Sequence, residues 1–263
     1  MMALVRASWL TALSYRLETF FSFFSLFVAI VPLYFISHAL QPVMASAIRV
    51  EAPQYFGYLM IGVITYTFVG TAVNSLHSAL STEISTGSFE ALVSTPTRLP
   101  VLLAGMIGQP FSINTLRAAV LFGLACVFGA RVVWTSLPPA LGILVLTILA
   151  YLPLGIFAAS LVLAFRTTGP IPTGILTISA LMGGVYYPTT VIPSWLERVS
   201  TFVPLAYGLR ALRRTLLDGA PLATSARDLT VLVVSTVVLF GASLVAFSYA
   251  LRHAKRAGTL AQY

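Results

Sequence analysis

Two segments apolar enough to cross a bilayer are separated by the polar stretch Glu83-Ile-Ser-Thr-Gly-Ser-Phe-Glu-Ala-Leu-Val-Ser-Thr-Pro-Thr-Arg-Leu-Pro-Val-Leu-Leu-Ala-Gly105. Ser85 is a residue type that caps the start of a helix, and Pro96 is one that ends it. Between them, Phe89, Leu92 and Val93 have the i, i+3, i+4 spacing of one helix face. The pattern predicts a short amphipathic helix with carboxylates at its start, held at a membrane surface as a docking element.

The composition of the chain is that of an integral membrane protein. The 263 residues are 58% hydrophobic and 8% charged, with a mean hydropathy of +0.95, whereas about a quarter of the residues in a soluble domain are charged. The apolar runs are long and unbroken, which favours helices over the alternating segments of a β-barrel. The net charge of +8 indicates basic residues that set topology and contact membrane lipids, and nucleic acid is not indicated as a partner.

The hydrophobic pattern predicts an all-α integral membrane fold, with one transmembrane domain over residues 1–263. We expect an interfacial helix at 1–18, a docking helix at 83–98 and short helices in one membrane leaflet at 188–219. A ragged start to the first span is the alternative for residues 1–18. Six spans are expected, at about 20–40, 55–80, 101–130, 137–165, a short fifth span that follows Pro170 and ends near Tyr187, and 229–251. A loop with Pro42, Arg49, Glu51 and Pro53 is expected after the first span.

The leaflet segment 188–219 has an amphipathic pattern of its own. It is punctuated by prolines and carries interfacial aromatic residues. Leucines and arginines are expected on different helix faces, with Leu205, Leu209, Leu212 and Leu216 on one and Arg210, Arg213 and Arg214 on another. This pattern predicts short helices embedded in or dipping into one leaflet rather than a soluble loop.

The distribution of basic residues predicts the orientation in the membrane. Six spans place both termini on the same side, and the opposite short loops carry only Arg49 and Arg131. Since short loops determine orientation more strongly than a long membrane-adsorbed segment, both termini and the docking helix are predicted to be cytoplasmic. The side of the termini holds Arg6, Arg16, Arg98, Arg166, Arg252, Lys255 and Arg256.

Residues that carry catalysis are missing or scattered. A phosphate-binding loop needs Gly-Lys-Ser/Thr, but the chain has one lysine, Lys255, and Arg256 follows it. The histidines His38, His77 and His253 do not have the spacing of metal ligands. The sequence therefore predicts no catalytic residue, no metal site and no cofactor bound by this chain. A docking helix without a motor implies a motor in another chain.

Two motifs carry a family resemblance. The docking stretch resembles the loop between the second and third spans in the permease subunit of type-2 ATP-binding-cassette (ABC) exporters. That loop has the pattern Glu-x-x-x-Gly-Thr/Ser-hydrophobic-Glu-x-Leu-x-x-Ser/Thr-Pro, matched here by Glu83, Gly87, Ser88, Phe89, Glu90, Leu92, Thr95 and Pro96. The second family motif follows the fifth span. This chain resembles it at Gly183-Gly184-Val-Tyr-Tyr-Pro188, Ile192-Pro193-Ser-Trp195-Leu, Pro204-Leu-Ala-Tyr207 and Arg213. The resemblance covers the whole chain.

The resemblance implies a complex of two permease copies and two ATPase subunits, with ATP and Mg²⁺ on the ATPase. It implies that a cleft of the ATPase receives the docking helix, through Glu83, Gly87, Phe89, Glu90, Leu92, Pro96 and Arg98. It implies that the substrate passes between the permeases, along the first, second and fifth spans. It also implies an external gate region with Tyr186, Tyr187, Pro188, Trp195, Tyr207, Arg210 and Arg213.

Several alternatives remain open. Arg210, Arg213 and Arg214 equally suit lipid phosphate, and Tyr186 and Tyr187 equally suit an aromatic belt at the membrane interface. The phenylalanines of the first span suit an amphipathic or lipid-linked substrate, and they suit lipid-facing packing equally. Polysaccharide is the alternative substrate within the class. An ion-gradient-driven secondary transporter or a non-catalytic membrane regulatory subunit are alternatives outside it, although Arg117 is the one charged residue within the predicted spans.

Overall fold

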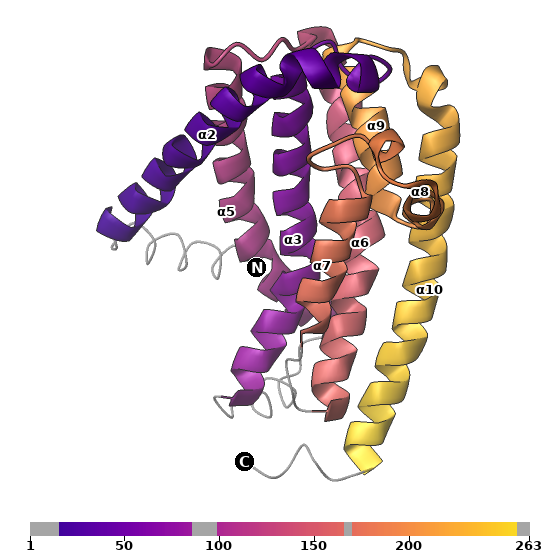
Figure 1. Ribbon diagram of the computed structural model, residues 1–263. Helices are drawn as coiled ribbons and strands as arrows, with labels where there is room; N and C mark the ends of the chain where they lie inside the picture. Colours follow the sequence, from indigo (N-terminus) through magenta and orange to yellow (C-terminus); the bar gives the residue numbers. More distant parts are fainter. Residues whose placement is uncertain (1–15, 86–98, 166–169, 257–263) are drawn as a thin grey trace.

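The computed structural model describes residues 16–85, 99–165 and 170–256, and every regular element in these ranges is helical (Figure 1). This confirms the predicted all-α class. The long helices are α2 (Arg16–Ile48), α3 (Tyr55–Ser85), α5 (Leu99–Val127), α6 (Leu137–Phe165) and α10 (Ala226–Arg256). The shorter helices are α7 (Ile171–Met182), α8 (Ser194–Ser200) and α9 (Pro204–Leu217). Short 3-10 turns form η1 (Trp134–Ser136), η2 (Thr189–Val191) and η3 (Leu222–Ser225).

Five helices in the described ranges are long and apolar enough to cross a membrane. They correspond to the predicted first, second, third, fourth and sixth spans. The predicted fifth span contains α7, which has 12 residues and so a length of about 18 Å, against about 30 Å for a hydrocarbon core. The helix is followed by Gly183 and Gly184, and Gly184 has a φ of +76°, which favours glycine. The count of six spans is therefore not confirmed.

The first long helix extends further than predicted. α2 continues through Pro42 to Ile48, so the expectation that Pro42 lies in the following loop is wrong. A proline inside a helix removes one backbone donor and bends the helix without always ending it. The last two turns of α2 contact the start of α3, because the Gln41 Oε1 accepts a 2.7 Å hydrogen bond from the backbone N–H of Tyr55. Residues 16–18 form the first turn of α2, and the rest of the predicted interfacial helix lies outside the described residues.

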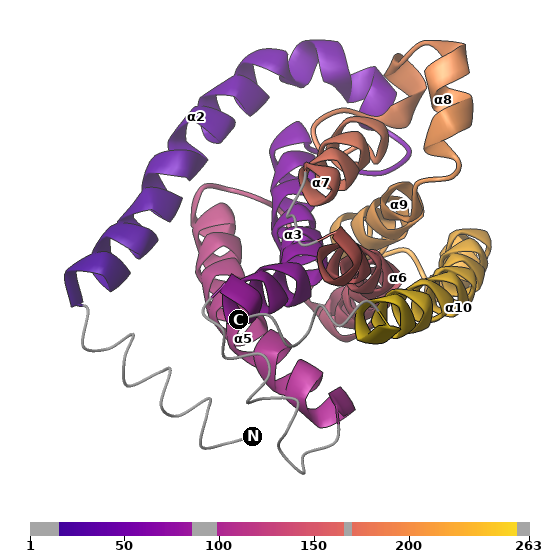
Figure 2. The ribbon, with the colours of Figure 1, turned by 90° about the horizontal axis from the view of Figure 1, so that it is seen from below.

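α3 is the central helix of the bundle. It packs against α2, α5, α6, α7 and α9, and Figure 2 shows it surrounded by these elements. Tyr58, Val69 and Val73 are fully buried in the main core. α6 approaches α3 closely at Gly155, where an added Cβ would overlap the carbonyl oxygen of Ala72. The contact between α3 and α6 forms the centre on which the other helices pack.

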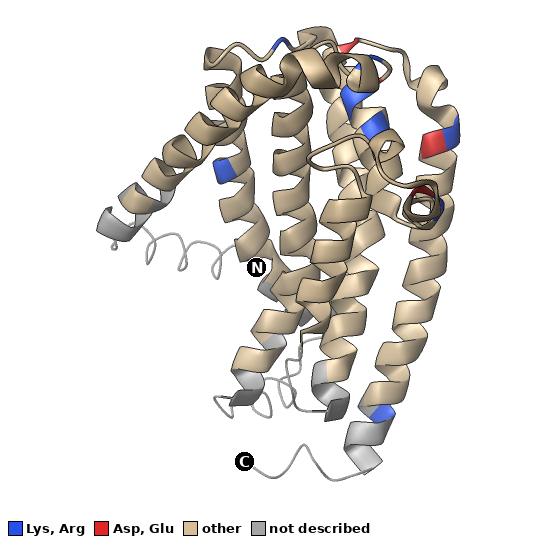
Figure 3. Cartoon of the chain, viewed as in Figure 1, with Lys and Arg blue, Asp and Glu red and all other residues tan. Residues whose placement is uncertain are grey.

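The two ends of the bundle differ in charge. The upper end in Figure 1 holds the α2–α3 connection, η1 and the α9–α10 connection, and the lower end holds the ends of α3, α6 and α10. Most of the charged residues in the described ranges lie toward the upper end, where acidic and basic residues are close together (Figure 3). In the predicted orientation, this upper end faces away from the cytoplasm.

The chain reverses direction between α7 and α10. The predicted leaflet segment 188–219 contains η2, α8 and α9. α9 packs against both α6 and α10, and Figure 1 shows α8 and α9 beside the upper part of α10. The structure thus has two short helices in this segment, and their location in one membrane leaflet stays a prediction.

Candidate functional site

One face of α9 is buried against the bundle. Leu205, Leu209, Leu212 and Leu216 are all buried, as their spacing predicts. Arg213 is buried on the same side and is only 1% exposed, so the prediction that it shares an arginine face with Arg210 and Arg214 is wrong. The reason is helix geometry, because a residue four positions after Leu209 lies nearly above it. A guanidinium group therefore points into the bundle.

The guanidinium group of Arg213 is held by protein groups. Its Nη2 donates to the carbonyl oxygens of Gly184 at 2.9 Å and Val185 at 3.1 Å. Its Nε donates to the carbonyl oxygen of Tyr58 at 3.2 Å, and its Nη1 donates to Glu51 Oε2 at 3.3 Å. The central carbon lies 3.3 Å from the centroid of the Tyr58 ring, which adds a cation–π contact. Arg213 thus connects α9 with α3, the α2–α3 connection and the turn after α7.

Two tyrosines of α3 hold the same turn. The Tyr58 hydroxyl donates to the carbonyl oxygen of Gly184 at 3.1 Å, and the Tyr55 hydroxyl donates to that of Tyr186 at 2.8 Å. α3 leaves room for this turn at Gly62, where an added Cβ would overlap the carbonyl oxygen of Val185. The turn over residues 183–187 is therefore fixed to α3 through its own carbonyl groups.

Two acidic residues complete the ionic network. Glu51 pairs with Arg213 and lies 3.9 Å from Arg210. Asp228, in the first turn of α10, pairs with Arg210 at 3.2 Å and with Arg214 at 3.5 Å. Both carboxylates are largely buried, with side chains 13% and 7% exposed. We call these five residues the arginine cluster; with three arginines and two carboxylates, its formal charge is +1.

The electrostatics of the cluster keep Arg213 charged. Burial lowers the pKa of Arg213 from its ordinary value, while Tyr58 and Glu51 act in the opposite direction. Arginine stays protonated in proteins even after such a decrease. Since its guanidinium is buried among protein groups, Arg213 does not reach lipid phosphate in this arrangement. Arg210 and Arg214 are partly exposed, with side chains 30% and 22% accessible, and both pair with Asp228.

The other predicted gate residues lie at different distances from this centre. Tyr186 joins through its carbonyl group while its side chain is exposed. The ring of Tyr207 lies 5.7 Å from the Arg210 guanidinium, and its hydroxyl donates to the carbonyl of Thr201. The remaining three are Tyr187, which is half-buried, Pro188, which is buried before η2, and Trp195, which is exposed on α8.

Sequence reasoning missed the acidic half of the cluster. Glu51 and Asp228 are two of only seven acidic residues in the chain, and each lies at the edge of an apolar span. That position was a signal, because carboxylates that come to lie within the membrane usually pair with a basic group. The pairing itself depends on α9 folding back beside α3, which the sequence does not reveal.

Most of the predicted docking residues lie outside the residues that the structure describes. Glu83 lies in the last turn of α3, and Gly87, Phe89, Glu90, Leu92, Pro96 and Arg98 lie outside the described residues. The docking helix therefore stays a prediction. In the ranges that the structure describes, no group of three His, Cys, Asp or Glu side chains could hold a metal ion.

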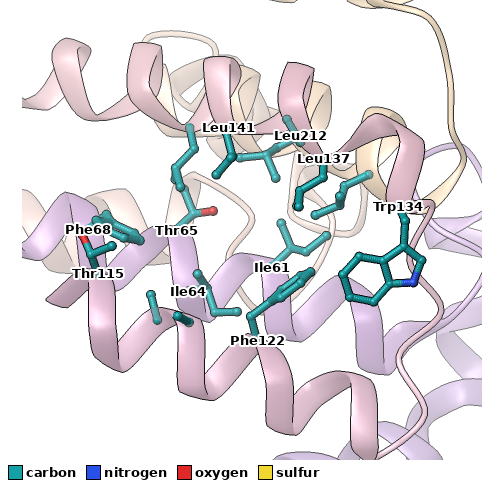
Figure 4. A pocket seen from close by; sticks show the side chains of 15 residues that line it. Ile61, Ile64, Thr65, Phe68, Thr115, Phe122, Trp134, Leu137, Leu141 and Leu212 are labelled. Carbon is teal, nitrogen blue, oxygen red and sulfur yellow. The ribbon is translucent and has the colours of Figure 1, made fainter.

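An apolar cavity of about 350 Å³ adjoins the buried face of α9. Figure 4 shows Ile61 and Ile64 of α3 pointing toward Phe122 of α5, with Leu137 and Leu212 close by. Thr65 and Thr115 are its only lining residues with a polar side-chain group apart from the indole of Trp134. The cavity suits an apolar group and offers no chemistry for a reaction.

Comparison with known proteins agrees with this arrangement. Residues 1–217 match the family described as ABC-2 type transporter. The chain is 23% identical over 193 residues to Nodulation protein J of Rhizobium leguminosarum bv. viciae, covering 73% of this chain and 74% of the relative. It is 25% identical over 181 residues to the inner membrane transport permease YadH of Escherichia coli strain K12, covering 68% of each. Because the family match spans most of its length, this multi-pass membrane protein belongs to the ABC-2 type transporter family.

Proposed function

We propose that this chain is the transmembrane subunit of an exporter that moves an amphipathic or lipid-linked substrate across the cytoplasmic membrane. The observation that carries the proposal is the family match over residues 1–217, which includes every described helix from α2 to α9. Permeases of this family work as dimers with an ATPase partner. For this chain we propose two permease copies, two ATPase copies that hold ATP and Mg²⁺, and contact with membrane lipids.

Each part of the chain has a role in this proposal. The docking helix transmits closure of the ATPase, with Phe89 anchored in an apolar cleft and Glu83 and Glu90 at its rim. The arginine cluster belongs to the external gate. Its support is the set of bonds that Arg213 makes to α3 and to the turn over 183–187. These bonds allow the turn and α9 to follow a movement of α3 as one unit.

The orientation of the chain tests the proposal, because a cytoplasmic ATPase must reach the docking helix. In a Cys126→Ala background, which removes the single native cysteine, we expect Ser85→Cys and Ala257→Cys to react only with reagents that enter the cytoplasm. Val50→Cys, at an exposed position between α2 and α3, should react with impermeant reagents added outside. The expectation follows from the basic residues on the side of the termini. Labelling of residue 85 from outside intact cells would contradict the exporter function.

Two other functions are alternatives to an exporter driven by an ATPase. A secondary transporter would use an ion gradient, and such transporters usually have ionisable residues within their spans. Between residues 20 and 165, the described helices α2, α3, α5 and α6 contain one charged residue, Arg117, apart from the last turn of α3. A regulatory subunit would bind the ATPase without moving a substrate. Polysaccharide remains the alternative substrate within the exporter class.

A further inference from the structure

A polar stripe runs along the lower half of α3. Its members recur every three or four residues and so share one helix face. This stripe lines a cavity of about 620 Å³ between α3 and α5 that is open to the outside, and its lining residues Ser78 and Gln109 are exposed. The stripe consists of Thr67, Thr71, Asn74, Ser78 and Thr82, and the further polar lining residues are Ser75 of α3 and Gln109 of α5.

The cavity has hydrogen-bonding capacity that the protein does not use. The Oγ1 atoms of Thr67 and Thr71 donate to carbonyl oxygens of their own helix, at 2.8 and 2.9 Å, and keep lone pairs as acceptors. The side-chain amides of Asn74 and Gln109 make no hydrogen bond with the rest of the described chain. Each amide offers two donors and one acceptor oxygen. Uncompensated polar groups are unfavourable in a membrane, so this face requires water or a polar ligand.

The described lining of the cavity carries no charge: no Asp, Glu, Lys or Arg is among its described lining residues. A second cavity of about 440 Å³, near the upper end between α2 and α3, has the same character. Its polar side chains are those of Ser37, His38, Gln41 and Gln54, together with the Tyr34 hydroxyl. An ionised ligand in the cavity between α3 and α5 would gain no countercharge from the described lining residues.

We propose that the cavity between α3 and α5 binds the polar headgroup of the transported molecule, and that this headgroup is neutral and rich in hydroxyl or amide groups, as a sugar is. The inference rests on the proposed exporter function and adds the chemical class of the substrate. Hydroxyl groups both donate and accept, which matches the amides of Asn74 and Gln109 beside the acceptor oxygens of Thr67 and Thr71. An anionic headgroup would meet no basic side chain among the described lining residues.

Binding of two fluorescent lipids to the purified full-length chain in detergent tests the proposal. The probes are fluorescently tagged glucosylceramide and ceramide 1-phosphate with the same chains and fluorophore. We expect the glucosyl probe to bind at least about tenfold more tightly by fluorescence anisotropy, because the phosphate finds no countercharge on the described lining residues. Asn74→Leu should weaken binding of the glucosyl probe by about tenfold, the effect of losing one or two hydrogen bonds.

A matched pair of substitutions provides the control. Thr71 and Thr115 each donate to the carbonyl oxygen four residues earlier, but only Thr71 lines this cavity. Thr71→Val should weaken glucosyl binding and Thr115→Val should not, so the test survives if Asn74→Leu fails to fold. Displacement by free glucose would identify a soluble sugar, and displacement only by unlabelled glucosylceramide a lipid-attached one; either result supports the headgroup chemistry.

Two outcomes overturn the inference. One is equal or tighter binding of the phosphate probe, and the other is equal loss of binding in Thr71→Val and Thr115→Val. Because binding is measured without an ATPase, either outcome leaves the exporter function standing. Failure of the exporter function would instead appear in the cysteine labelling, whatever the probes show.

Discussion

Phe89→Asp is expected to abolish capture of the ATPase and ATP-driven export while leaving membrane insertion unchanged. The change lies in the predicted docking helix, outside the spans. Burying a phenylalanine side chain contributes about 1.5–3 kcal/mol, whereas an ion pair at an exposed rim contributes about 0–1 kcal/mol. The aromatic side chain should therefore dominate the contact. The measurement is recovery of the ATPase with an affinity-tagged permease, followed by export in cells.

Glu90→Gln is the control for charge at the same helix, and it should weaken coupling only slightly. The competing explanation is that Phe89 packs against this chain's own spans or the lipid interface. In that case, Phe89→Asp would lower permease abundance while the surviving protein still bound its ATPase. A well-expressed Phe89→Asp permease that captures the ATPase and exports would show that the coupling surface lies elsewhere.

Arg213→Met is expected to destabilise the upper end of the bundle by about 3–5 kcal/mol and to impair export. The substitution leaves Glu51 largely buried beside a weaker partner, Arg210 at 3.9 Å. It also removes the donors to Gly184 and Val185 and the cation–π contact with Tyr58. Arg213→Lys should retain only part of the stability and of the export activity, because an ammonium group cannot reproduce the planar fork of donors. Thermal unfolding in detergent measures the effect.

Two variants separate this role from a general loss of charge. Arg198→Met removes an arginine that is exposed on α8 and should change stability by less than about 0.5 kcal/mol. The double variant Glu51→Gln, Arg213→Met should be more stable than the sum of the single effects predicts, because no buried charge remains unpaired between them. Additive effects, or equal effects of Arg213→Met and Arg198→Met, would rule out the buried pairing.

The long helices were predictable because their periodicity and composition act locally. The fourth span was predicted at 137–165, the range that α6 occupies, since the prolines at its start and Arg166 after it mark both ends. α3 also begins at Tyr55 as expected. The end of α2 was predicted too early because of Pro42. The helix continues through this proline, and the Gln41 side chain accepts a hydrogen bond from the first residue of α3. That contact is tertiary and leaves no pattern in the sequence.

The gate region was predicted as a motif and only partly as a structure. Gly183 and Gly184 indicate a turn, but the sequence does not show that α7 ends at Met182, directly before them. The helix of residues 204–217 was read as having separate leucine and arginine faces, yet Arg213 lies among the leucines. A buried arginine is unfavourable without partners, and its partners Glu51, Tyr58 and Gly184 come from segments distant in sequence. Only the packing of α9 brings them together.

Reconstitution of the purified chain in liposomes, with and without the ATPase that it captures, tests the central claim most directly. The account predicts that the isolated chain hydrolyses no ATP, since it lacks a phosphate-binding loop. The complex should hydrolyse ATP and move fluorescent glucosylceramide to the opposite leaflet, and blocking hydrolysis in the ATPase should stop both. Movement driven by a proton or sodium gradient without the ATPase, or robust ATP turnover by the isolated chain, would contradict it.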